Sequence, residues 1–255
     1  MPEFILQTEK LSKSFSGFVA VDEVSLKVKT HSIHALIGPN GAGKTTFFHL
    51  LTKFHRPTSG VIKYRGADIT ALAPERIARK GMIRSFQISA VFPRMTVLEN
   101  VLAGLQRKAG MSYRFLSPRQ KASFLVPQAE ELLEQVGLLD FAHEYASELP
   151  YGYKRALELA TTLGMDPELM LLDEPTQGMG IEDVSRVTQL IREVSAGRTI
   201  LMVEHNMNVV SEIADEITVL TRGRILANGT YEEISRNPAV LEAYMGKAAK
   251  EEKGS

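Results

Sequence analysis

The feature that most constrains this chain is the segment Gly38-Pro39-Asn40-Gly41-Ala42-Gly43-Lys44-Thr45-Thr46, which fits the pattern G-x-x-x-x-G-K-T. The apolar residues 32–37 before it have the composition of a buried strand, and residues 46–51 after it indicate the start of a helix. A strand, a glycine loop and a helix in that order form the context in which a backbone can surround phosphates. The alternative is an ordinary glycine-rich turn.

Each part of this segment has a physical role in phosphate binding. Glycines let the backbone curl so that several N–H groups point inward, and the following helix adds the positive end of its dipole. The Lys44 ammonium would reach the β- and γ-phosphates, and the Thr45 hydroxyl would ligate Mg2+. The sequence therefore predicts a nucleotide site in which residues 38–46 contact the phosphates.

The composition of the chain excludes several classes of protein. The chain has 255 residues, no cysteine and a formal net charge of zero. Without cysteine there is no disulfide scaffold or thiol chemistry, and without a basic stripe we expect no nucleic-acid partner. We see no secretory signal and no run of about 18 apolar residues, so any membrane role requires a partner subunit.

Strand and helix signals alternate along most of the chain, which favours a mainly parallel sheet. Strand-like alternation at 4–15 and 19–28 suggests a small antiparallel addition before the glycine loop. Further strands are expected at 61–64, 82–87, 169–172 and 199–203, with a hairpin at 217–220 and 224–228. Helices are expected at 74–80, 128–136, 156–163, 183–195 and 209–214.

Between residues 88 and 149 strand signals fade and helix formers dominate, with a loop expected at 110–118. The predicted fold class is α/β: a P-loop NTPase (RecA-like) mainly parallel core with an antiparallel β subdomain and an inserted α-helical subdomain at about 88–155. We expect a single nucleotide-binding domain over 1–246. The Lys/Glu-rich residues 247–255 have the composition of a disordered tail.

A second motif consists of the apolar residues 169–172 followed by Asp173, Glu174 and Pro175. A strand that ends in two carboxylates places them at the carboxyl edge of the sheet, beside the phosphate loop. Asp173 would hold Mg2+, and Glu174 would orient a water for attack on the γ-phosphate. Alone, the same residues could be a solvated strand end followed by a proline turn.

With these motifs in order, the chain resembles the nucleotide-binding subunit of ABC transporters over about residues 4–245. The resemblance implies that Phe15 stacks on the adenine of ATP, with Phe18 as a rival. It implies that Gln87 contacts Mg2+ or the attacking water, and that His205 is the family's switch histidine at the γ-phosphate. The residues it implies for catalysis are Glu174, His205, Gln87 and Lys44, and those for Mg2+ are Thr45, Gln87 and Asp173.

Residues 149–155, Leu-Pro-Tyr-Gly-Tyr-Lys-Arg, occupy the family's signature position. Compared with the common Leu-Ser-Gly-Gly-Gln, Pro150 replaces the serine and Tyr153 the glutamine, while Gly152 is kept. The resemblance implies that Gly152, at a helix N-terminus, faces the ATP of a second subunit. A Pro-Tyr-Gly variant is typical of the branch that resembles branched-chain amino acid importers.

Two further segments have less definite roles. No aspartate occurs in the loop 177–180, where many family members have one, so we assign it only flexibility. Apolar residues after Gln87 could form a groove for a helix of a membrane subunit or simply the core of the lobe. These residues are Ile88, Val91, Phe92, Met95 and Val97.

The resemblance implies a cytoplasmic ATPase subunit, peripheral on the inner face of the cell membrane. Two such chains, identical or merely similar, would bind two ATP molecules between them and drive membrane-spanning permeases, served by a solute-binding protein. The ending at 237–246 also favours the branched-chain amino acid group, with urea, amides or aromatic compounds as alternative cargo. The other classes considered are a soluble non-transport ABC ATPase and an unrelated P-loop kinase.

Overall fold

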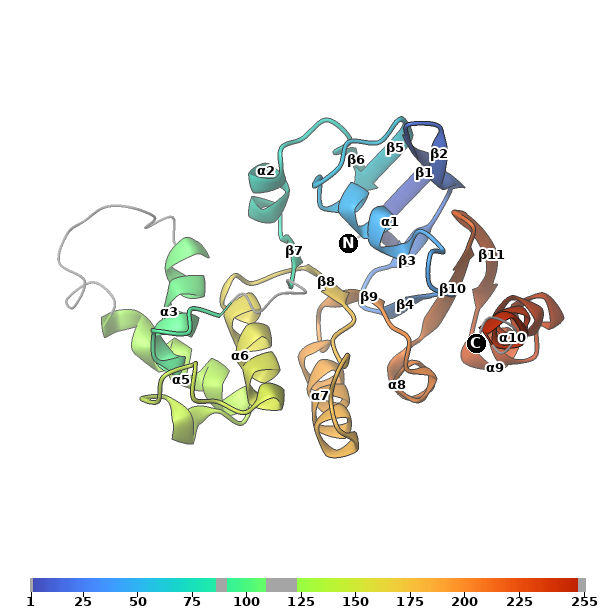
Figure 1. Ribbon diagram of the computed structural model, residues 1–255. Helices are drawn as coiled ribbons and strands as arrows, with labels where there is room; N and C mark the ends of the chain where they lie inside the picture. The colour runs from blue at the N-terminus through green and yellow to red at the C-terminus, as the bar shows by residue number, and fades with distance from the viewer. Residues whose placement is uncertain (1, 86–90, 109–122, 252–255) are drawn as a thin grey trace.

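The computed structural model describes residues 2–85, 91–108 and 123–251, with only the backbone described for 245–251. Figure 1 shows a small sheet, a larger sheet beneath it and a group of helices to one side. Gln87, Ile88 and the loop expected at 110–118 lie outside the described residues. Within those residues, no helix combines the length and apolarity needed to cross a membrane.

The small sheet is antiparallel, and its strand order is β2-β1-β5-β6 with β3 also paired to β1. Its strands are β1 (Phe4–Phe15), β2 (Phe18–Val24), β3 (Lys27–Lys29), β5 (Ser59–Tyr64) and β6 (Ala67–Asp68). The expected strand at 19–28 is thus divided in two. At the break the Thr8 hydroxyl donates to the Val24 carbonyl (3.0 Å) and accepts from the Leu26 N–H (2.9 Å).

The large sheet has the order β11-β10-β4-β9-β8-β7, with all neighbours parallel except the β10–β11 hairpin. Its strands are β4 (Ile33–Ile37), β7 (Met82–Arg84), β8 (Leu169–Asp173), β9 (Thr199–Val203), β10 (Glu216–Thr221) and β11 (Arg224–Gly229). Every residue of β4, β8 and β9 is buried. Strands covered on both faces need largely apolar sequence, and in these three only His34, Asp173 and Thr199 are polar.

The register of the central strands determines where the polar residues gather. Asp173, the last residue of β8, lies opposite Val203, the last residue of β9, and Val203 pairs in turn with Leu36 near the end of β4. Because these strands are parallel, the segments that follow them meet at one edge of the sheet.

Helices cover both faces of the large sheet (Figure 1). The side chains of α1 pack between the two sheets, with Phe47 and Phe48 fully buried. A second core joins the other face of the large sheet to α3, α5, α6, α7 and α8. The helices are α1 (Lys44–Leu51), α2 (Pro74–Arg79), α3 (Val97–Lys108), α5 (Val126–Gln135), α6 (Tyr151–Gly164), α7 (Ile181–Val194), α8 (Met207–Ile213), α9 (Tyr231–Ser235) and α10 (Pro238–Glu251), and the 3-10 turns are η1 (Ser123–Leu125) and η2 (Leu139–Phe141).

Helix ends differ from the expected ones for identifiable reasons. α6 starts five residues before the expected 156 because Pro150 is its N-cap, the kind of position at which proline is tolerated. The unexpected α9 starts with a capping box between Thr230 and Glu233. α10 runs through residues 247–251 of the expected tail, and 252–255 lie outside the described residues.

Candidate functional site

The loop between β4 and α1 requires glycine at two positions at least. Gly38 and Gly43 have φ values of +150° and +100°, which side chains rarely tolerate. A Cβ added at Gly38 would lie 2.0 Å from the Leu220 carbonyl oxygen, and one at Gly43 would lie 2.3 Å from that of Ala20. The loop is therefore held against β10 and β2 in a shape that only glycine permits.

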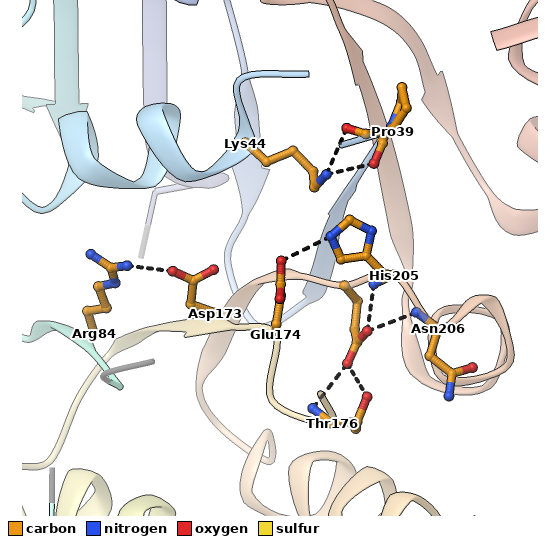
Figure 2. Close-up of polar contacts among 10 residues, drawn as sticks. Pro39, Lys44, Arg84, Asp173, Glu174, Thr176, His205 and Asn206 are labelled. Carbon is orange, nitrogen blue, oxygen red and sulfur yellow. Dashed lines mark hydrogen bonds and ion pairs between the residues drawn. The ribbon is translucent and has the colours of Figure 1, made fainter. Parts of the chain in front are cut away.

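Lys44, the first residue of α1, lies inside this loop. Its ammonium donates to the carbonyl oxygens of Gly38 (2.6 Å) and Pro39 (3.1 Å), as Figure 2 shows, and the residue is buried. Asn40, Gly41 and Thr45 are exposed, while Ala42 is buried and Thr46 is half-buried. A buried cation next to exposed loop backbone and the N-terminus of a helix suits a polyanion.

Asp173 is buried at the end of β8, and one of its oxygens is paired. The Arg84 Nη2 lies 2.5 Å from Oδ2, with the aspartate side chain 1% exposed and the arginine 13% exposed. The other oxygen, Oδ1, is buried and has no hydrogen-bond partner in the part of the chain that the structure describes. Sequence reasoning missed Arg84, because its partner is far away in the chain.

Glu174 points away from Asp173, toward His205 (Figure 2). Its N–H donates to the Val203 carbonyl (2.9 Å), and its φ of +48° then turns the chain out of the sheet. The Oε1 atom lies 3.0 Å from Nε2 of His205. The structure thus brings together the expected catalytic carboxylate and the expected switch histidine.

Two residues that sequence analysis gave no role of their own also contact this edge. Glu204 is almost completely buried and joins the segments around Thr176 and His205. Burial raises the pKa of Tyr244, on α10, to about 12, and a hydrogen bond with the Gly38 backbone opposes that rise. For Glu204 the only sequence signal was a carboxylate between a buried strand and a histidine.

The aromatic residues expected near adenine lie together on the small sheet. Phe15 and Phe18 pair across the β1–β2 hairpin and are 38% and 67% exposed. The Phe15 ring contacts His55 edge-on at 5.2 Å between centroids, and the Lys13 ammonium lies 4.9 Å from its centroid. Phe15 therefore has both an anchored ring and an accessible surface.

The signature segment lies at the start of α6, apart from α1 (Figure 1). A Cβ added at Gly152 would lie 2.4 Å from Oδ1 of Asp183, so this glycine permits close packing on α7. The Tyr151 hydroxyl donates to the Gln177 carbonyl (3.2 Å), which joins the signature to the loop 177–180. Arg186 lies over the ring of Tyr153, 4.5 Å from its centroid.

The expected groove is only partly accessible. Val97 is fully buried, Phe92 is 54% exposed, and Val91 and Met95 are half-buried. The buried Asn100 shapes this segment, because its side chain accepts from the Phe92 N–H (2.7 Å) and donates to the Thr96 carbonyl (2.8 Å). The described residues of this segment thus include both core and surface side chains.

The glycine loop after β4, with two carboxylates at the end of β8 two strands away in the same parallel sheet, defines a P-loop NTPase. Residues 21–177 match the family model described as ABC transporter, and residues 224–250 match the one described as branched-chain amino acid ATP-binding cassette transporter. The chain belongs to the ABC transporter family and is an ATP-binding cassette ATPase. The resemblance and the fold class expected from the sequence are confirmed.

Several relatives align over nearly the whole chain. The high-affinity branched-chain amino acid transport ATP-binding protein LivG of Escherichia coli is 41% identical, over 97% of this chain and 100% of its own. BraF of Pseudomonas aeruginosa, of the same description, is 39% identical, over 96% and 98%. The lipopolysaccharide export system ATP-binding protein LptB of Haemophilus influenzae is 32% identical, over 96% and 99%.

Solved structures agree with this assignment. An ATP-binding cassette of an ABC transporter in its ADP conformation superposes with a TM-score of 0.85 at 29% identity, covering 96% of this chain and all of that one. A nucleotide-free cassette superposes with a TM-score of 0.83 at 29% identity, covering 94% and 98%.

Proposed function

We propose that this chain is the ATP-hydrolysing subunit of an importer for branched-chain amino acids. The observation that carries the proposal is the meeting of Lys44, Asp173, Glu174 and His205 at one edge of the sheet (Figure 2). These residues supply a phosphate-binding cation, a metal-binding carboxylate, and a carboxylate–imidazole pair for the attacking water.

The nucleotide would bind along the β4–α1 loop. Lys44 would exchange the carbonyls of Gly38 and Pro39 for phosphate oxygens, and residues 38–46 would offer backbone N–H groups. Phe15 is the proposed adenine contact, because its exposed ring offers a flat surface for stacking.

The residues present fit Mg2+. The Oδ1 atom of Asp173 is a buried carboxylate oxygen without a hydrogen-bond partner among the described residues, and the Thr45 side chain is accessible beside the phosphate loop. Mg2+ usually takes one or two protein ligands together with substrate phosphates and water, so a full protein cage is unnecessary. Bound there, Mg2+ would neutralise charge on the β- and γ-phosphates. Gln87, outside the described residues, stays a predicted further ligand.

The chemical step rests on Glu174 and His205. The Glu174 Oε1 atom lies 3.0 Å from Nε2 of His205, so the carboxylate can hold the imidazole in place. The same carboxylate can also accept a hydrogen bond from the attacking water. The left-handed turn at Glu174 directs this carboxylate away from Asp173, so the two neighbours serve different partners. Lys44 would stabilise charge that develops on the phosphates.

The second half of each site would come from another chain, identical or similar. Gly152 is the second residue of α6, and α6 lies in the helical lobe, apart from α1 of its own chain (Figure 1). The N-terminus of α6 therefore suits the triphosphate held by a partner. Closure of such a dimer would be favoured because only the closed form offers both sets of phosphate contacts.

The relatives support the proposed cargo and location. LivG and BraF are named for branched-chain amino acid transport, and the model that matches residues 224–250 is described as a branched-chain amino acid ATP-binding cassette transporter. We infer membrane-spanning permeases and a solute-binding protein as partners, and a cytoplasmic position on the inner face of the membrane. LptB, named for lipopolysaccharide export, is more distant at 32% identity.

Glu174→Gln tests the proposed chemistry. This variant keeps the shape but loses the charge that orients water, so ATP turnover should fall by about 10²–10⁴-fold while ATP still binds. Phosphate release near the wild-type rate would remove Glu174 from this role. For the cargo, the chain reconstituted with its permeases should hydrolyse ATP faster when a leucine-loaded binding protein is added, and stimulation only by urea or an aromatic amide would redirect the assignment.

A further inference from the structure

A buried carboxylate outside the expected set of site residues connects the two segments that carry Glu174 and His205. Glu204 follows β9 and is 3% exposed. Its Oε1 accepts from the Thr176 N–H (3.2 Å) and the Thr176 hydroxyl, and its Oε2 accepts from the N–H groups of His205 (2.6 Å) and Asn206 (2.9 Å). We name these four residues the Glu204 cluster (Figure 2).

Each oxygen of Glu204 serves a different segment. Oε1 holds the segment after β8, two residues beyond Glu174, and Oε2 holds the backbone of His205 itself. The Glu174–His205 contact of 3.0 Å spans the same two segments. A single side chain therefore sets the separation of the backbones from which both side chains extend.

The chemistry of the cluster demands an acceptor at this position. Its three partner residues supply four donor groups, and an ionised carboxylate accepts at both oxygens. A glutamine of the same shape would direct its NH2 group either at the donors of Thr176 or at the N–H groups of His205 and Asn206. One segment would then lose its hydrogen bonds, and buried donors left unpaired are costly enough to move the backbone.

We propose that Glu204 is a positioning residue for ATP hydrolysis, which holds the segments after β8 and β9 so that Glu174 and His205 meet. This inference rests on the proposed function of those two residues. Glu204 itself need not touch the nucleotide, so its loss should slow the chemical step and leave nucleotide binding intact. A role in folding alone would instead lower stability and affinity together.

The test is Glu204→Gln in the full chain, assayed by single-turnover hydrolysis of labelled ATP and by binding of a non-hydrolysable analogue. A displacement of about 1 Å in a catalytic group can cost about 100-fold, so we expect the rate to fall by about 10- to 100-fold with analogue affinity unchanged within about 2-fold. In a His205→Ala background the same change should have a smaller effect than in the wild-type chain, because the Glu174–His205 contact is already lost there. Glu232→Gln, an exposed carboxylate on α9, is the matched control.

A milder variant covers the case in which Glu204→Gln does not fold. Thr176→Val keeps the shape and the backbone N–H but removes the hydroxyl donor, and it should slow hydrolysis by about 3- to 10-fold. Thr188→Val, which removes a buried hydroxyl bonded to the Val184 carbonyl, controls for the loss of a buried donor in general.

The outcomes distinguish a failure of the role of Glu204 from a failure of the proposed function. A folded Glu204→Gln variant with wild-type turnover would overturn the inference. So would a loss of turnover that is as large in the His205→Ala background as in the wild-type chain, or one that is explained by weaker binding of the analogue. If Glu174→Gln itself hydrolyses ATP normally, the proposed function fails first, whatever Glu204→Gln does. If Glu204→Gln does not fold, wild-type turnover of Thr176→Val would overturn the inference.

Discussion

Replacing Arg84 by methionine would show how strongly the carboxylate of Asp173 depends on its partner. The two side chains are 13% and 1% exposed, and the Nη2–Oδ2 distance is 2.5 Å. The remaining oxygen, Oδ1, has no partner among the described residues. Methionine fills much of the same volume without charge, so Arg84→Met would leave a buried carboxylate with neither oxygen paired to any residue that the structure describes.

The expected cost follows from burial. Removing one partner of a buried ion pair destabilises a protein by about 3–5 kcal/mol. For a chain of this size about 1 kcal/mol lowers the melting temperature by about 2–4 °C, so we expect a decrease of about 6–20 °C. The Arg65–Glu168 pair is a matched control, with a distance of 2.8 Å and side chains 51% and 36% exposed. Arg65→Met should cost at most about 1 kcal/mol.

The assay is thermal unfolding followed by circular dichroism at equal protein concentration, without nucleotide. Asp173→Asn combined with Arg84→Met completes the comparison: because it removes the unpaired charge, the double variant should melt above Arg84→Met alone. Equal decreases for Arg84→Met and Arg65→Met would refute the reasoning, since burial is the main difference between the two pairs.

Three other predictions concern binding, pH and assembly. Lys44→Ala should weaken ATP binding by more than about 100-fold, because it removes a charged donor from the phosphates, and an unchanged affinity by calorimetry would contradict the assignment of the loop. Burial, the largest cause, lowers the pKa of His34 to about 4 from 6.5, so the unfolded chain binds the proton more readily between these values. The free energy of unfolding should therefore decrease by about 3 kcal/mol as the pH falls through this window. If the urea midpoint of His34→Gln changed with pH as much as that of the wild-type chain, His34 would not be the cause. Because Pro150 replaces the usual serine, the isolated chain should dimerise weakly with ATP, and sedimentation showing a tight dimer would count against it.

The sequence predicted those parts of the site whose position follows from a local motif or from the order of the strands. A strand, a glycine loop and a lysine identify the phosphate site without knowledge of distant residues, as at Gly38–Lys44. Asp173 and Glu174 follow a buried strand, and parallel strand ends share one edge, so their place beside that loop could also be expected.

The missed features depend on partners far away in the chain. Arg84 looked like an ordinary residue of a short strand, and its partner Asp173 lies 89 positions further on. Glu204 has its meaning only because Thr176, 28 positions earlier, lies beside it once β8 and β9 pair. The division of the strand at 19–28 likewise depends on Thr8, on another strand. No periodicity within one segment contains this information.

The two adjacent carboxylates need opposite kinds of support, and the backbone provides both. Asp173 is the last ladder residue of β8, so its side chain stays in the buried layer where Arg84 pairs one oxygen. Glu174 keeps one further hydrogen bond to Val203 and then adopts φ +48°, a conformation that costs a non-glycine residue about 1 kcal/mol or more. If β8 continued as a regular strand, the Glu174 side chain would point to the face of the sheet opposite that of Asp173. It would then lie over that face and not at the carboxyl edge of the sheet. The left-handed turn places that carboxylate next to His205, and the Glu204 cluster holds the segment that leaves the turn. The strain at Glu174 is thus offset by contacts that place the carboxylate beside His205, where we propose that it orients water.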